Sequence, residues 1–385
     1  MRGEYWDKAY AHARQAGHSA VALNANRSAL ESFETAAEAL ARLPESDEHL
    51  AAAISLRFNI RDVLFVMGEP DAILAHMEAA EGFAAKLKDD RRLIEVLLYK
   101  SGYYWANGEQ LDQAMPLARR AYDMAKALND PELTGLACYR LATAHSSVGN
   151  YRESVEFAEE GLTLLEPQAE TLFRFGGLVY GFIGSFCAMG SAELGEFERA
   201  DKIGRRCYEL AVAADHAYSI TVTCFGIAHS YLLQDRIDEA LPILDYSLQQ
   251  IETHDARAAA PWVAGRAVYA LVRAGRDSEI QGLVNLVRDS AKLLQSMRHG
   301  FAFTWAARGY LDLDQLDQAE SLTRAVFEKF KYDPEKGVHA WAYWILAEIA
   351  RRRGQDDVAR EANQKARAIA EELAMAPLLA LCAAP

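Results

Sequence analysis

Residues 141–161 read LATAHSSVGNYRESVEFAEEG, and this stretch decides the fold. Two helix-length segments flank Gly149-Asn150, and Gly and Asn favour the end of one helix and the start of the next. Ala142 and Ser154 lie twelve residues apart, one in each segment, and both are small. Because small residues at facing positions let two helices approach closely, the stretch predicts a tight helical hairpin.

The same pattern recurs along the chain with a period near 40 residues. The marker position in the second helix of each hairpin is small or β-branched, and its spacing is mostly 39 to 41, with one step of 44 and one of 46. The partner position twelve residues earlier is mostly small, but Arg61 and Val268 depart from this rule and predict looser packing there. The second-helix positions are Ala29, Ile73, Ala114, Ser154, Ala200, Ala240, Ile280, Ala319 and Ala359, and the small partner positions are Gly17, Gly102, Ala142, Ala188, Ala228, Ala307 and Ala347.

One hairpin cannot bury its apolar face without neighbours, so this periodicity predicts an all-α, right-handed superhelical α-solenoid of about nine hairpins. We expect one repeat array over residues 1–385, with residues 374–385 as a tail or a truncated further hairpin. The glycine-rich uncharged stretch 175–192 is expected to be a repeat helix. The expected hairpins are approximately 4–43, 47–87, 90–128, 131–165, 171–214, 217–252, 259–295, 299–331 and 336–373, and turns are expected at 68–70, 108–110, 149–151, 195–197, 234–236, 275–277, 314–316 and 354–356.

Charge and cysteine content restrict the partners. The net charge of -14 argues against a phosphate-binding surface, so no nucleic acid is expected. Five cysteines lie far apart without a CxxC pair, which is typical of a reduced, cytoplasmic protein. Glu4 and Asp7 interrupt the sequence before any apolar run, so no signal peptide is visible and no membrane partner is expected.

The hairpin quoted above resembles the tetratricopeptide repeat (TPR). Its landmark positions are occupied by Leu141-Ala142, His145, Gly149, Tyr151, Ser154, Ala158 and Gly161. The period near 40 exceeds the usual 34 of that family. It resembles the variant in the maltose-regulon activator and related signal-transduction ATPases, which implies longer helices.

Several strings also resemble the C-terminal repeat region of bacterial class III adenylate or guanylate cyclases that carry an AAA-type ATPase module. No GxxxxGK[ST] loop and no metal-binding aspartates of a cyclase domain occur. The resemblance therefore implies only the regulatory or sensor region, without inherited catalytic residues. The strings are EYWDKA (4–9), RQAG (14–17), LRF (56–58), RDVL (61–64), LNDP (128–131), ADHAYS (214–219) and EELAMAPL (371–378).

No enzyme motif is visible, so we expect no catalytic residue, no cofactor and no metal. Ten histidines are scattered singly. His145 and His229 fall on repeat helices, where a hydrogen-bonded histidine of the core or groove is favoured over a metal ligand. The glycines at 177, 181 and 184 are expected to lie within a helix and permit close helix contact or a bend, rather than to form a phosphate loop.

In TPR arrays the first helix of each hairpin lines the concave face, and its inward positions here are rich in aromatics. One interpretation is that the winding of the array buries this set; the other is a groove for a peptide, an apolar ligand or another segment of a parent protein. Trp341, Trp344, Glu348 and Arg351 form one helical stripe, which suits a peptide anchor or a small polar ligand. The concave positions are Phe58, Tyr99, Tyr103, Tyr139, Phe182, Phe225, His229, Trp262, Tyr269, Phe301, Arg308, Trp341, Trp344, Glu348 and Arg351.

The sequence thus favours a non-catalytic binding scaffold, with the sensor region of an ATPase-linked nucleotide cyclase as the leading hypothesis. Its expected partner is a protein or peptide, including the ATPase and cyclase modules of a parent chain, and a small-molecule effector is a further ligand class. The alternative is a stand-alone TPR adaptor that binds a partner's peptide. A reading frame that continues upstream of Met1 into an ATPase module would favour the first hypothesis, and a natural start there the second. An enzyme with an unrecognised site in the superhelix is the third reading.

Overall fold

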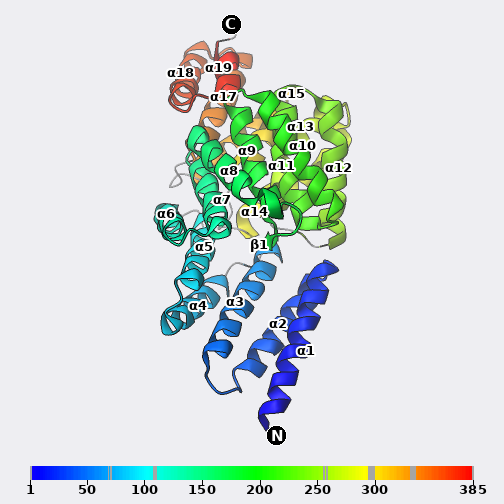
Figure 1. The fold of residues 1–385 in the computed structure, drawn as a ribbon. Coiled ribbons are helices and arrows are strands. Elements are labelled where there is room, and N and C mark those ends of the chain that lie inside the picture. The colour runs from blue at the N-terminus through cyan, green and yellow to red at the C-terminus, as the bar shows by residue number, and fades with distance from the viewer. Residues whose placement is uncertain are drawn as a thin grey trace.

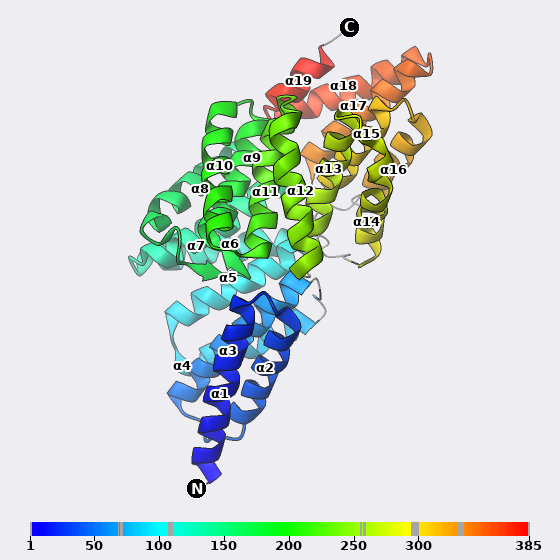
Figure 2. The same ribbon diagram turned by 90° about the vertical axis from the view of Figure 1, so that its right-hand side faces the viewer.

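A computed structural model describes residues 2–67, 69, 72–106, 111–254, 256, 259–293, 300–329 and 335–383. Consecutive helices pack as hairpins that follow one another along a superhelical solenoid, with the two termini at opposite ends (Figure 1 and Figure 2). The first helices of the hairpins are α1 (Arg2–Ala22), α3 (Asp47–Met67), α5 (Asp90–Ala106), α7 (Pro131–Ser147), α9 (Val179–Glu193), α11 (Ala217–Leu233), α13 (Ala260–Arg273), α15 (Gly300–Asp312) and α17 (Lys336–Arg352). The second helices are α2 (Asn26–Leu40), α4 (Ile73–Leu87), α6 (Leu111–Ala127), α8 (Tyr151–Leu165), α10 (Phe197–Ala213), α12 (Ile237–His254), α14 (Ile280–Leu293), α16 (Leu316–Lys329) and α18 (Asp356–Glu372), and α19 (Ala376–Cys382) packs on α18.

The two helices of a hairpin differ in burial. Every residue of α9 is buried, and so are nearly all residues of α7, α11 and α13. The second helices bury one stripe: α10 buries Ala200, Gly204, Cys207 and Ala211, at steps of four and three residues. The first helices therefore form the interior of the solenoid and the second helices form its outer layer.

The small residues predicted at the hairpin contacts are buried, as expected. In the quoted hairpin the Ser154 hydroxyl donates a 2.8 Å hydrogen bond to the Ala142 carbonyl, which joins α8 to α7. A Cβ on Gly102 would lie 2.6 Å from the guanidinium carbon of Arg140, so a larger residue there would require Arg140 to shift. Arg61 and Val268 are also fully buried, and this burial gives no sign of the looser packing that their size predicted.

Most predicted turns lie between two helices, although the turns at 68–70 and 108–110 lie outside the described residues except for Glu69. Gly149 has a φ of +84°, a left-handed conformation that ends a helix at little cost for glycine. Where the repeat lacks this glycine, Asp235 and Asp314 adopt it with φ of +60° and +57°. Helix termination therefore explains the Gly and Asp residues of the repeat.

The stretch 175–192 is not helical throughout, which corrects the expectation for its first residues. Strands β1 (Phe173–Arg174) and β2 (Gly177–Leu178) form an antiparallel hairpin, and α9 begins only at Val179. Gly177 therefore lies in a strand, whereas Gly181 and Gly184 lie in α9. A Cβ on Gly184 would lie 2.1 Å from the sulfur of Cys207, so this glycine permits close contact between α9 and α10, as expected.

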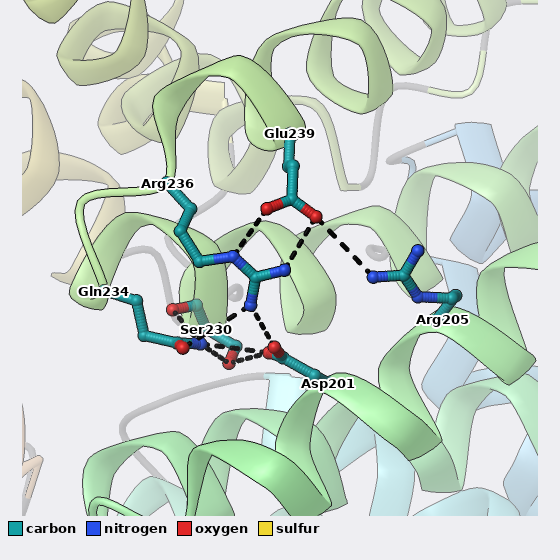
Figure 3. A network of polar contacts seen from close by, with 6 residues as sticks. All are labelled: Asp201, Arg205, Ser230, Gln234, Arg236 and Glu239. Atoms are coloured by element: carbon teal, nitrogen blue, oxygen red, sulfur yellow. Dashed lines mark hydrogen bonds and ion pairs between the residues drawn. The ribbon is translucent and has the colours of Figure 1, made fainter.

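A polar network joins the inner helix α11 to the outer helices α10 and α12 (Figure 3). The guanidinium of Arg236 donates two 2.6 Å hydrogen bonds to the carboxylate of Glu239 and a further bond to Asp201. Asp201 also accepts hydrogen bonds from Ser230 at 2.7 Å and Gln234 at 3.0 Å. These groups are partly exposed and bind one another, so the network joins the three helices.

Candidate functional site

The structure buries most of the predicted concave set inside the solenoid. From α3 to α13 the aromatic rings make a continuous path through the interior. Phe58 stacks on Tyr99 with ring centroids 4.2 Å apart, and the ring centroid of Phe225 lies 5.0 Å from that of Trp262. Self-burial therefore accounts for much of the aromatic content. The buried members are Phe58, Tyr99, Tyr139, Phe182, Phe225, His229, Trp262, Tyr269 and Trp341; Tyr103, Phe301, Arg308, Trp344 and Glu348 are partly exposed, and Arg351 is exposed.

The interior is closed because the C-terminal helices fold back onto the middle of the array. The indole N–H of Trp341 on α17 donates to both carboxylate oxygens of Glu193 on α9, at 3.1 and 3.2 Å, although the two residues are 148 positions apart. A Cβ on Gly337 would lie 2.0 Å from the hydroxyl of Tyr151 on α8. The ninth hairpin thus meets the fourth and the fifth across the superhelix, in addition to the contacts between neighbours.

Glu193 belongs to a buried polar network that joins the first helices α9, α11, α13, α15 and α17. The Nε2–H of His229 donates to Glu193 at 2.8 Å, while His229 Nδ1 accepts from Trp305 at 3.2 Å and from Arg266 at 3.1 Å. These donors require the Nε2–H tautomer and a neutral ring. His229 is therefore the hydrogen-bonded core histidine that the sequence favoured over a metal ligand. No cluster of three His, Cys, Asp or Glu side chains in the described ranges could hold a metal ion.

Burial changes the proton affinity of this network. It raises the pKa of Glu193 to about 8, against the opposing effects of the Trp341 hydrogen bond and of Arg308 and Arg266. It also lowers the pKa of His229 well below its usual value and that of Arg266 to about 9. In each case the low-dielectric interior disfavours the charged form, so protonation and packing are coupled here.

Except for Tyr103, which lies on α5, the members of the predicted set that keep some exposure lie on α15 and α17. The guanidinium of Arg308 lies over three indoles, 4.3 Å from the ring centroid of Trp305, 4.9 Å from that of Trp341 and 5.7 Å from that of Trp344. Trp341 and Trp344 contact each other edge to face, with centroids 5.9 Å apart. One turn further along α17, Arg351 forms an ion pair with Glu348. We call Phe301, Arg308, Trp344, Glu348 and Arg351 the α15–α17 cluster.

Two hollows border the buried interior. A cavity of about 40 Å³ is lined by Trp105, Trp262 and Phe301, of which Phe301 belongs to the α15–α17 cluster. It has room for roughly three water molecules. A larger pocket of about 200 Å³ lies between α3, the β1–β2 hairpin and the start of α11, and its lining includes Asp62 and Gly176.

Sequence reasoning did not identify Arg61, Asp62, Arg140 and Glu193 as interior polar groups. These charged residues lie on first helices that are otherwise largely apolar, and that is the signal which could have identified them. A charged residue at such a position must have a partner inside the protein, because an unpaired buried charge destabilises the folded state.

Comparisons with known proteins agree with this fold. No family model matches the chain. Tetratricopeptide repeat protein 29 of Trypanosoma brucei brucei is 26% identical over 243 residues, which cover 60% of this chain and 44% of that protein. The chain thus spans less than half the length of this relative.

Two solved structures share the architecture. A Rap protein complexed with Competence and Sporulation Factor superposes with a TM-score of 0.66 at 13% identity, covering 95% of this chain and 98% of that chain. A Rap conjugation gene regulator in complex with a Phr peptide gives a TM-score of 0.55 at 10% identity, covering 94% and 95%. At such identities the likeness concerns the fold, which is a TPR-like helical repeat solenoid. None of these three names refers to a cyclase or an ATPase.

Among the described residues, no helix has the length and apolar character that a bilayer span requires.

Proposed function

We propose that the chain is a non-catalytic repeat scaffold that binds a peptide or protein segment through the α15–α17 cluster. The observation that carries this proposal is the position of Arg308 over three indoles, of which Trp344 remains partly exposed, as Arg308 itself does. Aromatic side chains and arginine are enriched among the residues that dominate binding energy at interfaces. The Rap neighbours, whose structures contain a bound factor or peptide, support the same use of the fold.

In the wider context, the scaffold is the regulatory region of an ATPase-linked nucleotide cyclase or a related signalling protein. The support is the set of sequence strings between residues 4 and 378 that resemble such regions. Its partners would be the ATPase and cyclase modules of the parent chain, or a small-molecule effector. The alternative remains a stand-alone TPR adaptor, and the coding sequence upstream of Met1 separates the two.

The binding proposal is tested by selecting peptides from a random phage library on the purified chain and measuring their affinities by calorimetry. Trp344→Ala should weaken binding about tenfold or more, since an aromatic anchor contributes at least about 1 to 2 kcal/mol. Trp344 is partly exposed, so its loss should affect stability less than the 3 to 5 kcal/mol, roughly, of a buried Trp. Trp6→Ala is the matched control, because Trp6 is also partly exposed and lies on α1.

Equal affinity of the Trp344→Ala and Trp6→Ala proteins for every selected peptide would remove the α15–α17 cluster as the site. A large loss of stability in Trp344→Ala without any loss of affinity would assign Trp344 to the core. The scaffold function would then need another surface, while the fold would be unaffected.

A further inference from the structure

Two buried guanidinium groups, on the first helices of the second and fourth hairpins, lack enough hydrogen-bond acceptors. Arg61 on α3 and Arg140 on α7 are 0% and 2% exposed, and the Nε and Nη2 atoms of each have no hydrogen-bond partner. One carboxylate faces them: Asp62 accepts from Arg61 Nη1 at 3.0 Å and from the hydroxyl of Tyr99 at 3.1 Å. The immediate cluster therefore carries one unbalanced positive charge and several unsatisfied donors, which is an unusual condition for a protein interior.

Aromatic rings cover these guanidinium groups. The guanidinium of Arg61 lies 4.3 Å from the ring centroid of Phe65, and that of Arg140 lies 3.9 Å from the ring of Phe175 and 4.8 Å from that of Tyr139. Cation–π contact partly offsets burial of the charge, but it provides no acceptor for N–H groups that point along the guanidinium plane. Burial accordingly lowers the pKa of Arg140 to about 10. The rings enclose the charges without satisfying their hydrogen bonds.

Phe175 reaches this position from a strained turn. Phe173 pairs with Leu178 and Arg174 with Gly177, so Phe175 and Gly176 form the two-residue loop, with φ of +58° and +90°. Such loops prefer Asn or Gly at both positions, and a residue with a Cβ in the left-handed region costs roughly 1 to 2 kcal/mol. Burial of the Phe175 ring offsets this cost. The buried ring therefore accounts for Phe at this position, and the preference of the turn does not.

The turn also borders open space. Gly176 lines the 200 Å³ pocket together with Asp62 and Tyr218, and a Cβ on Gly176 would lie only 2.8 Å from Val66. In the β1–β2 turn, Gly176 thus faces the pocket while the ring of Phe175 covers the guanidinium of Arg140, and Asp62 links the pocket to Arg61. Movement of this one turn would connect the pocket to both guanidinium groups (Figure 1 shows β1 beside the end of α3).

We propose that Arg61 and Arg140 form a binding site for a carboxylate, which Phe175 covers in the ligand-free protein. The ligand is a peptide segment that carries an aromatic ring next to a carboxylate, above all a C-terminal Phe, Tyr or Trp. Its ring takes the place of Phe175 and its carboxylate accepts hydrogen bonds from the two guanidinium groups. This inference rests on the proposed peptide-binding function and adds a second site, at the other end of the array from the α15–α17 cluster.

The chemistry of the site favours a carboxylate over a phosphate. A carboxylate carries one negative charge and balances the one excess positive charge, whereas a doubly charged phosphate would leave a buried negative charge. The planar fork of arginine matches the two oxygens of a carboxylate. An aromatic ring is expected in the ligand because the site already accommodates the ring of Phe175. The centroid of that ring lies 4.9 Å from the Tyr99 ring and 5.7 Å from the Tyr139 ring.

The test uses N-acetylphenylalanine as the probe and N-acetylphenylalaninamide, which lacks the carboxylate, as its neutral analogue. Calorimetric titration should detect the acid and not the amide. Phe175→Ala should tighten binding of the acid about tenfold or more, because removing the cover raises the population of the open site. Arg140→Met should weaken it about tenfold or more through the lost charged hydrogen bonds. Tyr5→Ala is the control, since Tyr5 is exposed on α1 and does not line the pocket, so the affinity of this variant for the acid should equal that of the wild type.

Circular dichroism must show each variant to be folded, and Arg140→Gln replaces Arg140→Met if the latter is not. N-acetylaspartylphenylalaninamide then tests whether a side-chain carboxylate serves as well as a terminal one. Equal binding of acid and amide, or unchanged affinity in both Phe175→Ala and Arg140→Met, would overturn the proposal. Selected peptides that bind without sensitivity to these variants would overturn it too, while leaving the peptide-binding function in place.

Discussion

Substitution of Glu193 by Gln should make the stability of the protein less dependent on pH. Glu193 is buried, and its pKa is raised from 4.5 to about 8, chiefly because burial disfavours the carboxylate. The folded state therefore holds a proton that the unfolded state releases above pH 4.5. The stability that this proton contributes is fully present below pH 4.5 and is lost as the pH rises through 8. Gln keeps the size and hydrogen-bonding oxygen of the side chain but does not titrate.

The neighbouring histidine has the opposite effect at lower pH. Burial lowers the pKa of His229 well below 6.5, so its contribution is present above pH 6.5 and is lost as the pH falls below that value. Of these two groups, Glu193 therefore determines how stability changes with pH above pH 6.5. Between pH 6.5 and 8 its linkage removes roughly 1 to 2 kcal/mol from the wild-type free energy of unfolding. For a chain of 385 residues, this corresponds to roughly 2 °C in the melting temperature.

The assay compares melting of the wild type, Glu193→Gln and Glu198→Gln by circular dichroism at pH 6.5 and 8.0. Glu198 on α10 is exposed, so its variant should follow the wild type at both pH values. The melting temperature of Glu193→Gln, relative to the wild type, should be about 2 °C higher at pH 8.0 than at pH 6.5. The same offset at both pH values would refute the reasoning, because Glu193 would then have the same protonation in the folded and unfolded states.

Three further outcomes are expected. Ala240→Leu and Ala319→Leu should each lower the free energy of unfolding by about 1 to 3 kcal/mol through overpacking, and unchanged urea midpoints would contradict the hairpin register. Gly265→Ala should cost at least about 2 kcal/mol, since its Cβ would lie 2.3 Å from the backbone oxygen of Ala302. Gly282→Ala, which meets nothing within 4 Å, should instead gain roughly 0.5 to 1 kcal/mol, and parallel urea titrations compare the two. The purified chain should neither release phosphate from ATP nor form cyclic nucleotides by mass spectrometry; activity that follows the protein through a second column would contradict the non-catalytic assignment.

The repeat register could be predicted from sequence because it depends on local geometry. Small residues such as Ala142 and Ser154 must face each other within a hairpin, and their twelve-residue spacing follows from helix length and turn length alone. The β1–β2 hairpin was not predicted, because the uncharged run after Phe175 has a composition typical of a buried helix. Its two-residue loop also has Phe where Asn or Gly would have indicated a turn.

The candidate site could be predicted only in part. The register shows that Trp341 and Trp344 face inward, but the contact of Trp341 with Glu193 depends on the pitch of the whole superhelix. Small rotations at each of the intervening hairpins add up over 148 residues, and no local pattern specifies their sum. The difference between the buried Trp341 and the partly exposed Trp344 therefore appears only in the three-dimensional structure.

The contact between α9 and α17 changes how the array can respond to a ligand. In an open solenoid each repeat contacts only its neighbours, so a local change spreads by a sum of pairwise steps. Here Glu193 joins the fifth hairpin to the ninth through Trp341 and to the sixth through His229. A ligand that moved Trp344 on α17 would act on its neighbour Trp341 and hence on Glu193 directly, without passing through α15. Binding at the α15–α17 cluster and packing of the central hairpins would then be linked through the carboxyl group of Glu193. The protonation of this group would change with the contact between α9 and α17.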